Sequence, residues 1–106
     1  MPKSAQLKVY AHDGALDLHV SPEVRAALRE IIDEKPKRLV VDMGNVPYVD
    51  SSGLAVLIGA KQELEAGGGT FVLAAPQQAV RTILESARLD QYFKLAADVE
   101  AAMASR

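Results

Sequence analysis

The segment that decides the fold is residues 38–75, RLVVDMGNVPYVDSSGLAVLIGAKQELEAGGGTFVLAA. It opens at 38–43 with a short, nearly continuous apolar run, which is typical of a strand buried on both faces. A helix is predicted over 52–66, and it ends at the glycines 67–69 because glycine readily adopts the left-handed cap conformation. The run at 70–75 predicts a second central strand. This order of elements predicts two parallel strands joined by a right-handed crossover.

The residues that precede this unit predict another strand and a turn. At 6–12, QLKVYAH, partial alternation predicts a strand with one wet face. The apolar side would carry Leu7, Val9 and Ala11, and the wet side Lys8, Tyr10 and His12. The pair at 13–14, Asp-Gly, predicts a turn, and ALDLHV at 15–20 predicts a second short strand or a strand end.

A first helix is predicted to begin at Ser21. We expect Ser21 to be its N-cap and Pro22 to occupy its first position. Its apolar stripe has the spacing of one helical face, over Val24, Ala27, Leu28, Ile31 and Ile32. Pro36 cannot continue the helix and therefore ends it.

The C-terminal third continues the alternation of helices and strands. Pro76 is expected to begin a third helix, 92–96 to form a short last strand, and Asp98 to cap a short final helix. The whole order predicts an α/β fold with a mostly parallel sheet. Because no repeat, linker or low-complexity tract interrupts the chain, we expect a single domain over residues 1–106.

The composition excludes several classes of function. The 106 residues are 49% hydrophobic and 25% charged, as in an ordinary soluble domain. A net charge of −2 without a basic cluster gives no reason to expect a nucleic acid or a membrane as partner. The absence of cysteine excludes disulfides and zinc–thiolate sites. Without an apolar leader or a run long enough to span a bilayer, we expect a cytoplasmic protein.

The titratable residues give little support for an enzyme. His12 and His19 lie on either side of a turn without a third ligand, so we expect no metal. Ser51, His19 and Asp17 are residue types of a hydrolase triad, but the G-x-S-x-G motif is missing. The sequence contains neither G-x-x-x-x-G-K-[ST] nor G-x-G-x-x-G, the glycine motifs that bind phosphate groups, and no cofactor is expected.

The short stretch Asp50-Ser51-Ser52-Gly53 allows two interpretations. All three polar residues are preferred caps for the helix that follows. The stretch also follows a buried strand, and open α/β sheets expose their sites at the carboxyl ends of strands. A serine at a helix N-terminus is a favourable place for a phosphate, since the helix dipole and free N–H groups stabilise negative charge. Local physics permits either role.

Around this motif the chain resembles the STAS domain of bacterial anti-sigma factor antagonists. The resemblance rests on a hydrophobic residue followed by D-S-[ST]-G-L, here VDSSGL at 49–54, between a strand and a helix that ends in glycines. DGALDLHVSPEVRAALREII resembles the family's G-E-L-D segment and first helix, and AVRTILESARLDQYFKL its third helix and last strand. The match covers about residues 7–104.

The resemblance implies a fold, a function and a set of site residues. The fold would be a four- to five-stranded sheet with about four helices, and the chain would have no catalytic activity. Ser51 would be phosphorylated by an anti-sigma factor that is a serine kinase, and a phosphatase would reset it. The unphosphorylated antagonist would bind the kinase and free a sigma factor. The implied partner-binding residues are Asp17, Asp50, Ser51, Ser52, Gly53 and Leu54.

Departures from the family pattern leave alternatives open. Ala15 replaces the Glu of G-E-L-D, and few residues precede the strand at 6–12, where the family has another strand. An edge strand would then be missing, and we expect a monomer or a weak dimer. The alternative functions are a STAS subunit of a lipid-transport ABC system or a stressosome scaffold. A small hydrolase using Ser51 is a third hypothesis, disfavoured by the missing general base.

Overall fold

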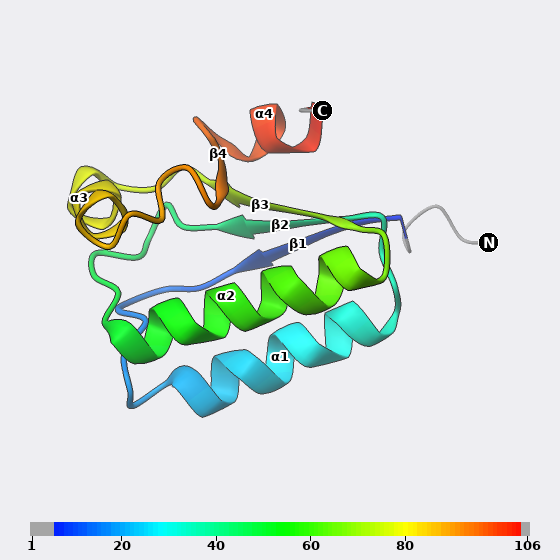
Figure 1. Cartoon of the computed structure of the whole chain (residues 1–106), viewed down its shortest axis with the longest axis horizontal. Coiled ribbons are helices and arrows are strands. Elements are labelled where there is room, and N and C mark those ends of the chain that lie inside the picture. The colour runs from blue at the N-terminus through cyan, green and yellow to red at the C-terminus, as the bar shows by residue number, and fades with distance from the viewer. Residues whose placement is uncertain (1–5, 105–106) are drawn as a thin grey trace.

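The computed structural model describes residues 6–104, which form a four-stranded sheet with the strands in chain order (Figure 1). The strands are β1 (Leu7–Ala11), β2 (Arg38–Asp42), β3 (Thr70–Ala74) and β4 (Lys94–Ala96). Every neighbouring pair is parallel. The predicted α/β fold with a mostly parallel sheet is therefore confirmed.

Four helices connect and cover the strands. They are α1 (Ser21–Asp33), α2 (Ser51–Ala66), α3 (Gln78–Ser86) and α4 (Val99–Ala104). In Figure 1, α1 and α2 lie side by side under one face of the sheet, α4 lies over the other face, and α3 sits at the end where the strands finish. The sequence placed the start of α2 one residue too late and the start of α3 at Pro76, two residues too early.

The two central strands have apolar side chains on both faces, which explains their nearly continuous apolar sequences. Leu39, Val41, Phe71 and Leu73 belong to the main core with α1, α2 and α3. Val40, Val72 and Ala74 form a smaller cluster with Ala102 of α4. Because both layers are almost fully buried, β2 and β3 hold the carboxyl end of the sheet rigidly in place.

The prediction of the solvent-exposed face of β1 is wrong. Tyr10 packs against the main core, whereas Val9 is 45% exposed and Ala11 is exposed. The reason is the position of α4. This helix packs on β2, β3 and β4, so the same face of the sheet is left uncovered at β1. Burial, and secondarily the Glu23 carboxylate, raises the pKa of the Tyr10 hydroxyl.

The predicted second strand at 15–20 does not form. Leu16 makes one isolated parallel bridge with Val49, and residues 17–20 then turn into α1. Leu16 and Val49 are both buried, so the bridge pins this turn against the loop that leads into α2.

Ser21 is not the N-cap of α1, contrary to the sequence prediction. The cap position belongs to Val20, which has no side-chain hydrogen bond to the helix. The Ser21 hydroxyl instead donates to the backbone oxygen of Asp17 at 2.7 Å, and the residue is buried. The hydroxyl therefore closes the turn before the helix. Pro22 is the second residue of α1, one position later than predicted.

Asp98 and the glycines after α2 behave as predicted. Asp98 Oδ1 accepts from the Ala101 amide at 2.7 Å, and Gly68 has the positive φ of +92° that ends α2. Within residues 6–104, β1 is an edge strand, and the position of a preceding strand, at 1–5, lies outside the described residues. That residues 1–106 form a single domain stays a prediction. None of the described helices has the length and apolar character to cross a membrane.

Candidate functional site

The candidate site lies at the N-terminus of α2, at the end of the sheet where the strands finish (Figure 1). β2 ends at Asp42, and residues 43–50 form the loop that leads to Ser51, the first residue of α2. This is the edge at which open α/β sheets place their sites, because the loops there are free to diverge from the packed strands. The position predicted from the DSSG motif is therefore on the expected edge.

Asp50 is the N-cap of α2 and also the link to a distant loop. Its Oδ1 accepts from the Gly53 amide at 2.9 Å, which satisfies one of the unpaired N–H groups of the first helical turn. Its Oδ2 accepts from the Leu18 amide at 3.0 Å, across 32 residues of sequence. Of the three candidate caps in the motif, the structure shows Asp50. Both carboxylate oxygens are occupied by backbone amides.

Gly53 allows α2 to approach the Leu16 backbone. Gly53 is buried, and a Cβ placed on it would overlap the Leu16 carbonyl oxygen and lie 2.9 Å from Val49 Cγ1. The same Leu16 oxygen accepts from the Asp50 amide at 3.1 Å. The glycine is therefore needed for the packing of three segments at one point. Its predicted role in partner binding is untested.

The other predicted site residues surround this point with different exposures. Ser51 is exposed, Ser52 is half-buried, and Leu54 is half-buried and packs against the main core. Asp17 lies in the adjoining turn, where its Oδ1 accepts from the amides of His19 and Val20. The structure thus brings all six predicted residues to one end of α2, and Ser51 is the serine that projects into solvent.

The Asp50 contacts lead to a stability prediction. We expect Asp50→Ala to lower the free energy of unfolding by about 2 kcal/mol, because a helix cap and a second amide partner are lost together. Urea denaturation measures this change. Asp98→Ala is the matched control, since it removes a single, exposed cap bond from a short helix, and we expect a loss of at most about 1 kcal/mol there. Equal effects of the two substitutions would contradict the linking role of Asp50.

The geometry gives no support to a metal site or a hydrolase triad. Within residues 6–104, no three His, Asp or Glu side chains gather closely enough to hold a metal ion. The hydrogen bonds found for the Asp17 carboxylate go to backbone amides in its own turn, as in an Asx turn. In a hydrolase triad, by contrast, the carboxylate accepts a hydrogen bond from the ring of the catalytic histidine and orients it.

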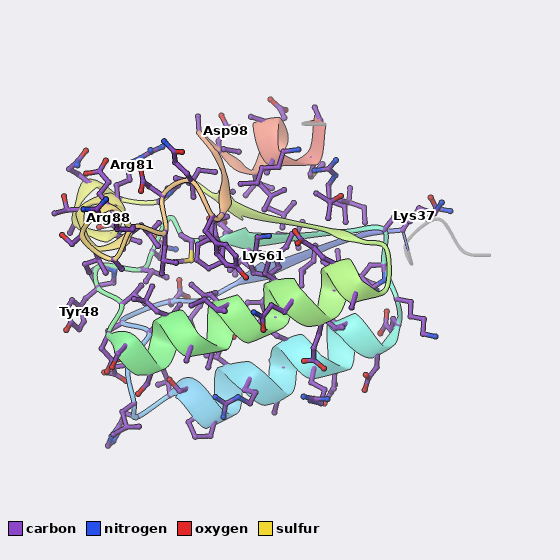
Figure 2. The ribbon with its side chains drawn as sticks, viewed as in Figure 1. Lys37, Tyr48, Lys61, Arg81, Arg88 and Asp98 are labelled. Atoms are coloured by element: carbon purple, nitrogen blue, oxygen red, sulfur yellow. The ribbon has the colours of Figure 1, made fainter. Side chains whose placement is uncertain are left out.

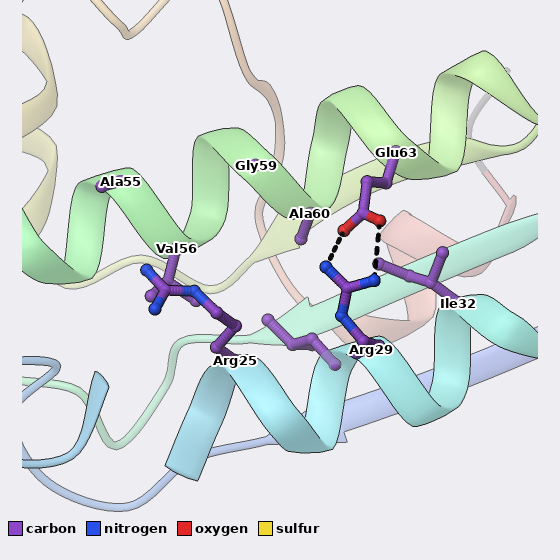
Figure 3. Close-up of a pocket in the computed structure, with 9 residues that line it drawn as sticks. Arg25, Arg29, Ile32, Ala55, Val56, Gly59, Ala60 and Glu63 are labelled. Atoms are coloured by element: carbon purple, nitrogen blue, oxygen red, sulfur yellow. Dashed lines mark hydrogen bonds and ion pairs between the residues drawn. The ribbon is translucent and has the colours of Figure 1, made fainter. Parts of the chain in front are cut away.

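One of the hollows on the surface is a groove between α1 and α2 (Figure 3). Arg25 and Arg29 line it from α1, and Ala55, Gly59 and Glu63 from α2. Arg29 spans it with two contacts of 3.3 Å to Glu63, and both side chains are about half exposed. Among the described residues, no buried side-chain polar atom lacks a partner. The groove therefore has solvated charges at its rim and lacks the convergent buried polar groups of a ligand pocket.

Two exposed apolar residues lie beside the site, and the sequence analysis did not predict a functional role for either. Leu18 is 72% exposed and Tyr48 is 52% exposed. The sequence predicts a short strand or a strand end for the segment with Leu18, and it assigns no role to Tyr48. The available signal was an isolated leucine between Asp17 and His19, in a stretch too short and polar to bury it.

The fold and this site define a STAS domain, and the chain belongs to that family: the model of the STAS domain matches residues 1–102. The curated relatives include two anti-sigma F factor antagonists. The one from Paenibacillus polymyxa is 30% identical over 72% of this chain and 66% of its own length. The one from Lysinibacillus sphaericus is 26% identical over 83% of this chain and 76% of its own length.

Solved structures agree with the family assignment. The anti-sigma factor antagonist SpoIIAA in its unphosphorylated form is 26% identical, with a TM-score of 0.77 over 92% of this chain and 85% of its own. A sulfate transporter family protein from Wolinella succinogenes is 20% identical, with a TM-score of 0.81 over 92% of this chain and 82% of its own. The second likeness shows the fold alone.

The comparisons identify the general class of function. The chain is a STAS domain that is similar to anti-sigma factor antagonists. STAS anti-sigma factor antagonists are binding modules without enzymatic activity, so the prediction that this chain is not an enzyme is confirmed.

Proposed function

We propose that this chain is an anti-sigma factor antagonist whose binding to an anti-sigma factor kinase is controlled by phosphorylation of Ser51. The unmodified protein binds the kinase and releases a sigma factor, the phosphorylated protein does not, and a phosphatase restores the first state. The observation that carries the proposal is the exposure of Ser51 directly after the capping Asp50. Ser52, the alternative acceptor, is half-buried.

The electrostatics of the helix end support phosphorylation without unfolding. In the transfer, the Ser51 hydroxyl oxygen forms a bond to the terminal phosphorus of ATP, the bond to ADP breaks, and the hydroxyl proton leaves to a base of the kinase. The product adds about −1.5 to −2 charges at neutral pH. The helix dipole favours negative charge at this end, so α2 tolerates the group. The fold would therefore persist while the surface changes.

The added charge lies close to the carboxylates of Asp50 and Asp17. Both Asp50 oxygens already accept from amides, and Asp17 adds a second carboxylate in the adjoining turn. A partner surface that accommodates a neutral serine hydroxyl would face a dianion beside these acids. Covering a dianion removes it from water, which costs several kcal/mol when no opposite charge pairs with it, and the phosphate also adds bulk. The expected result of phosphorylation is release.

A relative supports the same control mechanism. SpoIIAA has been solved in an unphosphorylated and in a phosphorylated form, at 26% identity to this chain, with TM-scores of 0.77 and 0.69. The intact Asp50-Ser51-Ser52-Gly53 motif favours this function over that of a lipid-transport subunit, in which the serine motif is often altered. A stressosome scaffold is the other alternative function.

The modification site is tested by phosphate mapping. The protein is incubated with ATP and each anti-sigma factor kinase encoded in its own genome, and the phosphate is located by mass spectrometry. We expect a single phosphate on Ser51, retained in Ser52→Ala and lost in Ser51→Ala. A phosphate on Ser52, or firm binding to a kinase that leaves Ser51 unmodified, would overturn the proposal.

A further inference from the structure

Two large apolar side chains stand in solvent beside Ser51. Leu18 is 72% exposed and Tyr48 is 52% exposed, the two highest values among the exposed large hydrophobic residues. In Figure 2, Tyr48 lies at the end of the molecule where the strands finish and projects away from the ribbon. Single exposed apolar residues are common, so the pair gains meaning only from how it is held and where it lies.

Backbone contacts hold these two residues in a fixed frame. The Leu16 amide donates to the Tyr48 oxygen at 2.9 Å, and the Asp50 amide donates to the Leu16 oxygen at 3.1 Å. The Leu18 amide donates to Asp50 Oδ2 at 3.0 Å. The side chains of Leu16 and Val49 are buried beneath this frame. Leu18 and Tyr48 are therefore presented from two loops that are already ordered, so little loop entropy is lost on binding.

We infer that Leu18 and Tyr48 are the apolar anchors through which the anti-sigma factor kinase seats itself over Ser51. The inference rests on the proposed function and names the partner-facing residues of that site. A kinase that transfers a phosphate to Ser51 must cover the surface around it, and the Leu18 loop is bonded to the residue that precedes Ser51. The partner carries an apolar recess next to its catalytic centre.

The chemistry of the pair suits this role. Tyrosine is enriched in interface hot spots because it buries a large, stiff ring at low entropic cost. Leu18 and Tyr48 carry no charge, so they contribute affinity while Ser51 determines whether the complex persists. The carboxylates of Asp17 and Asp50 accept hydrogen bonds from backbone amides. Leu18 and Tyr48 are therefore the main groups left to contact a partner at this end of α2.

The other exposed hydrophobic residues occupy different parts of the fold. Val9 is on β1 and Met103 is on α4, on the opposite side of the sheet from α1 and α2. The ring of Tyr92 is covered by Lys61 Nζ, 4.5 Å from its centroid, and packs edge-on against Phe93. Met103, with 41% exposure and no place near Ser51, is the matched control for Leu18.

The test measures binding and phosphorylation with the purified kinase that modifies wild-type Ser51. Calorimetry is expected to show roughly tenfold weaker binding for Leu18→Ala and for Tyr48→Ala, the cost typical of an interface anchor. Tyr48→Phe and Met103→Ala should bind within about twofold of wild type. In the kinase assay, Leu18→Ala should raise KM and leave kcat unchanged, because an anchor acts on binding and not on phosphoryl transfer.

The outcomes separate this inference from the proposed function. If both alanine variants bind and are phosphorylated as the wild type is, the anchors are wrong and the switch at Ser51 stands. If kcat falls while KM is unchanged, the pair acts on the chemistry and the anchor role is also wrong. If no anti-sigma factor kinase encoded in the genome binds or phosphorylates the wild type, the proposed function fails and the assigned partner fails with it.

Discussion

Gly53→Ala is expected to lower the free energy of unfolding by about 3 kcal/mol, which is large for the addition of one methyl group. Alanine normally favours a helix over glycine by up to about 1 kcal/mol, so the expected sign is reversed. The cause is the overlap of the new Cβ with the Leu16 carbonyl oxygen, with Val49 Cγ1 a further 2.9 Å contact. Backbone and buried side chains cannot move aside cheaply.

Gly59 provides a control on the same helix. A Cβ there meets nothing within 4 Å, because the residue faces the open groove between α1 and α2. Gly59→Ala should therefore raise the free energy of unfolding by up to about 1 kcal/mol. Urea denaturation of the two variants measures both changes. Similar effects at both positions would show that the close approach at Gly53 is not the cause.

Ser51→Asp is expected to weaken binding to the anti-sigma factor by roughly thirtyfold or more, about 2 kcal/mol, whereas Ser51→Ala stays within about threefold of wild type. The aspartate adds negative charge and bulk beside Asp50 at the point of contact. It also suits a helix N-terminus, so its thermal stability should equal or exceed that of the wild type. Lost binding would then report the interface and not unfolding.

The matched control for charge is Gln62→Glu. Gln62 is exposed on α2, and the substitution adds the same single charge far from Ser51. Calorimetry with the purified anti-sigma factor should give wild-type affinity for this variant. If Ser51→Asp binds as tightly as Gln62→Glu, negative charge at Ser51 does not control the complex.

The central part of the fold could be predicted because its pattern is local. The apolar runs of β2 and β3, and the glycines after α2, depend only on strand burial and helix termination. The wet face of β1 could not be predicted, since it depends on which strands α4 covers. Alternation shows that the two faces differ, but does not show which face another element will reach.

The site was predictable in position but not in construction. The D-S-S-G motif led to Asp50 and Ser51, and the structure gives Asp50 as the cap. The bond from the Leu18 amide to Asp50 spans 32 residues, and no local pattern announces it. Ser21 was misassigned for a similar reason, because its hydroxyl meets the Asp17 oxygen only when the turn before α1 has formed.

The most direct test of the account uses a preformed complex of the anti-sigma factor and its sigma factor. The complex is challenged with equal concentrations of the unmodified protein and the protein phosphorylated at Ser51, and free sigma factor is measured by size-exclusion chromatography. We predict that the unmodified protein releases the sigma factor and that the phosphorylated protein leaves the complex intact. Equal release by the two forms would contradict it.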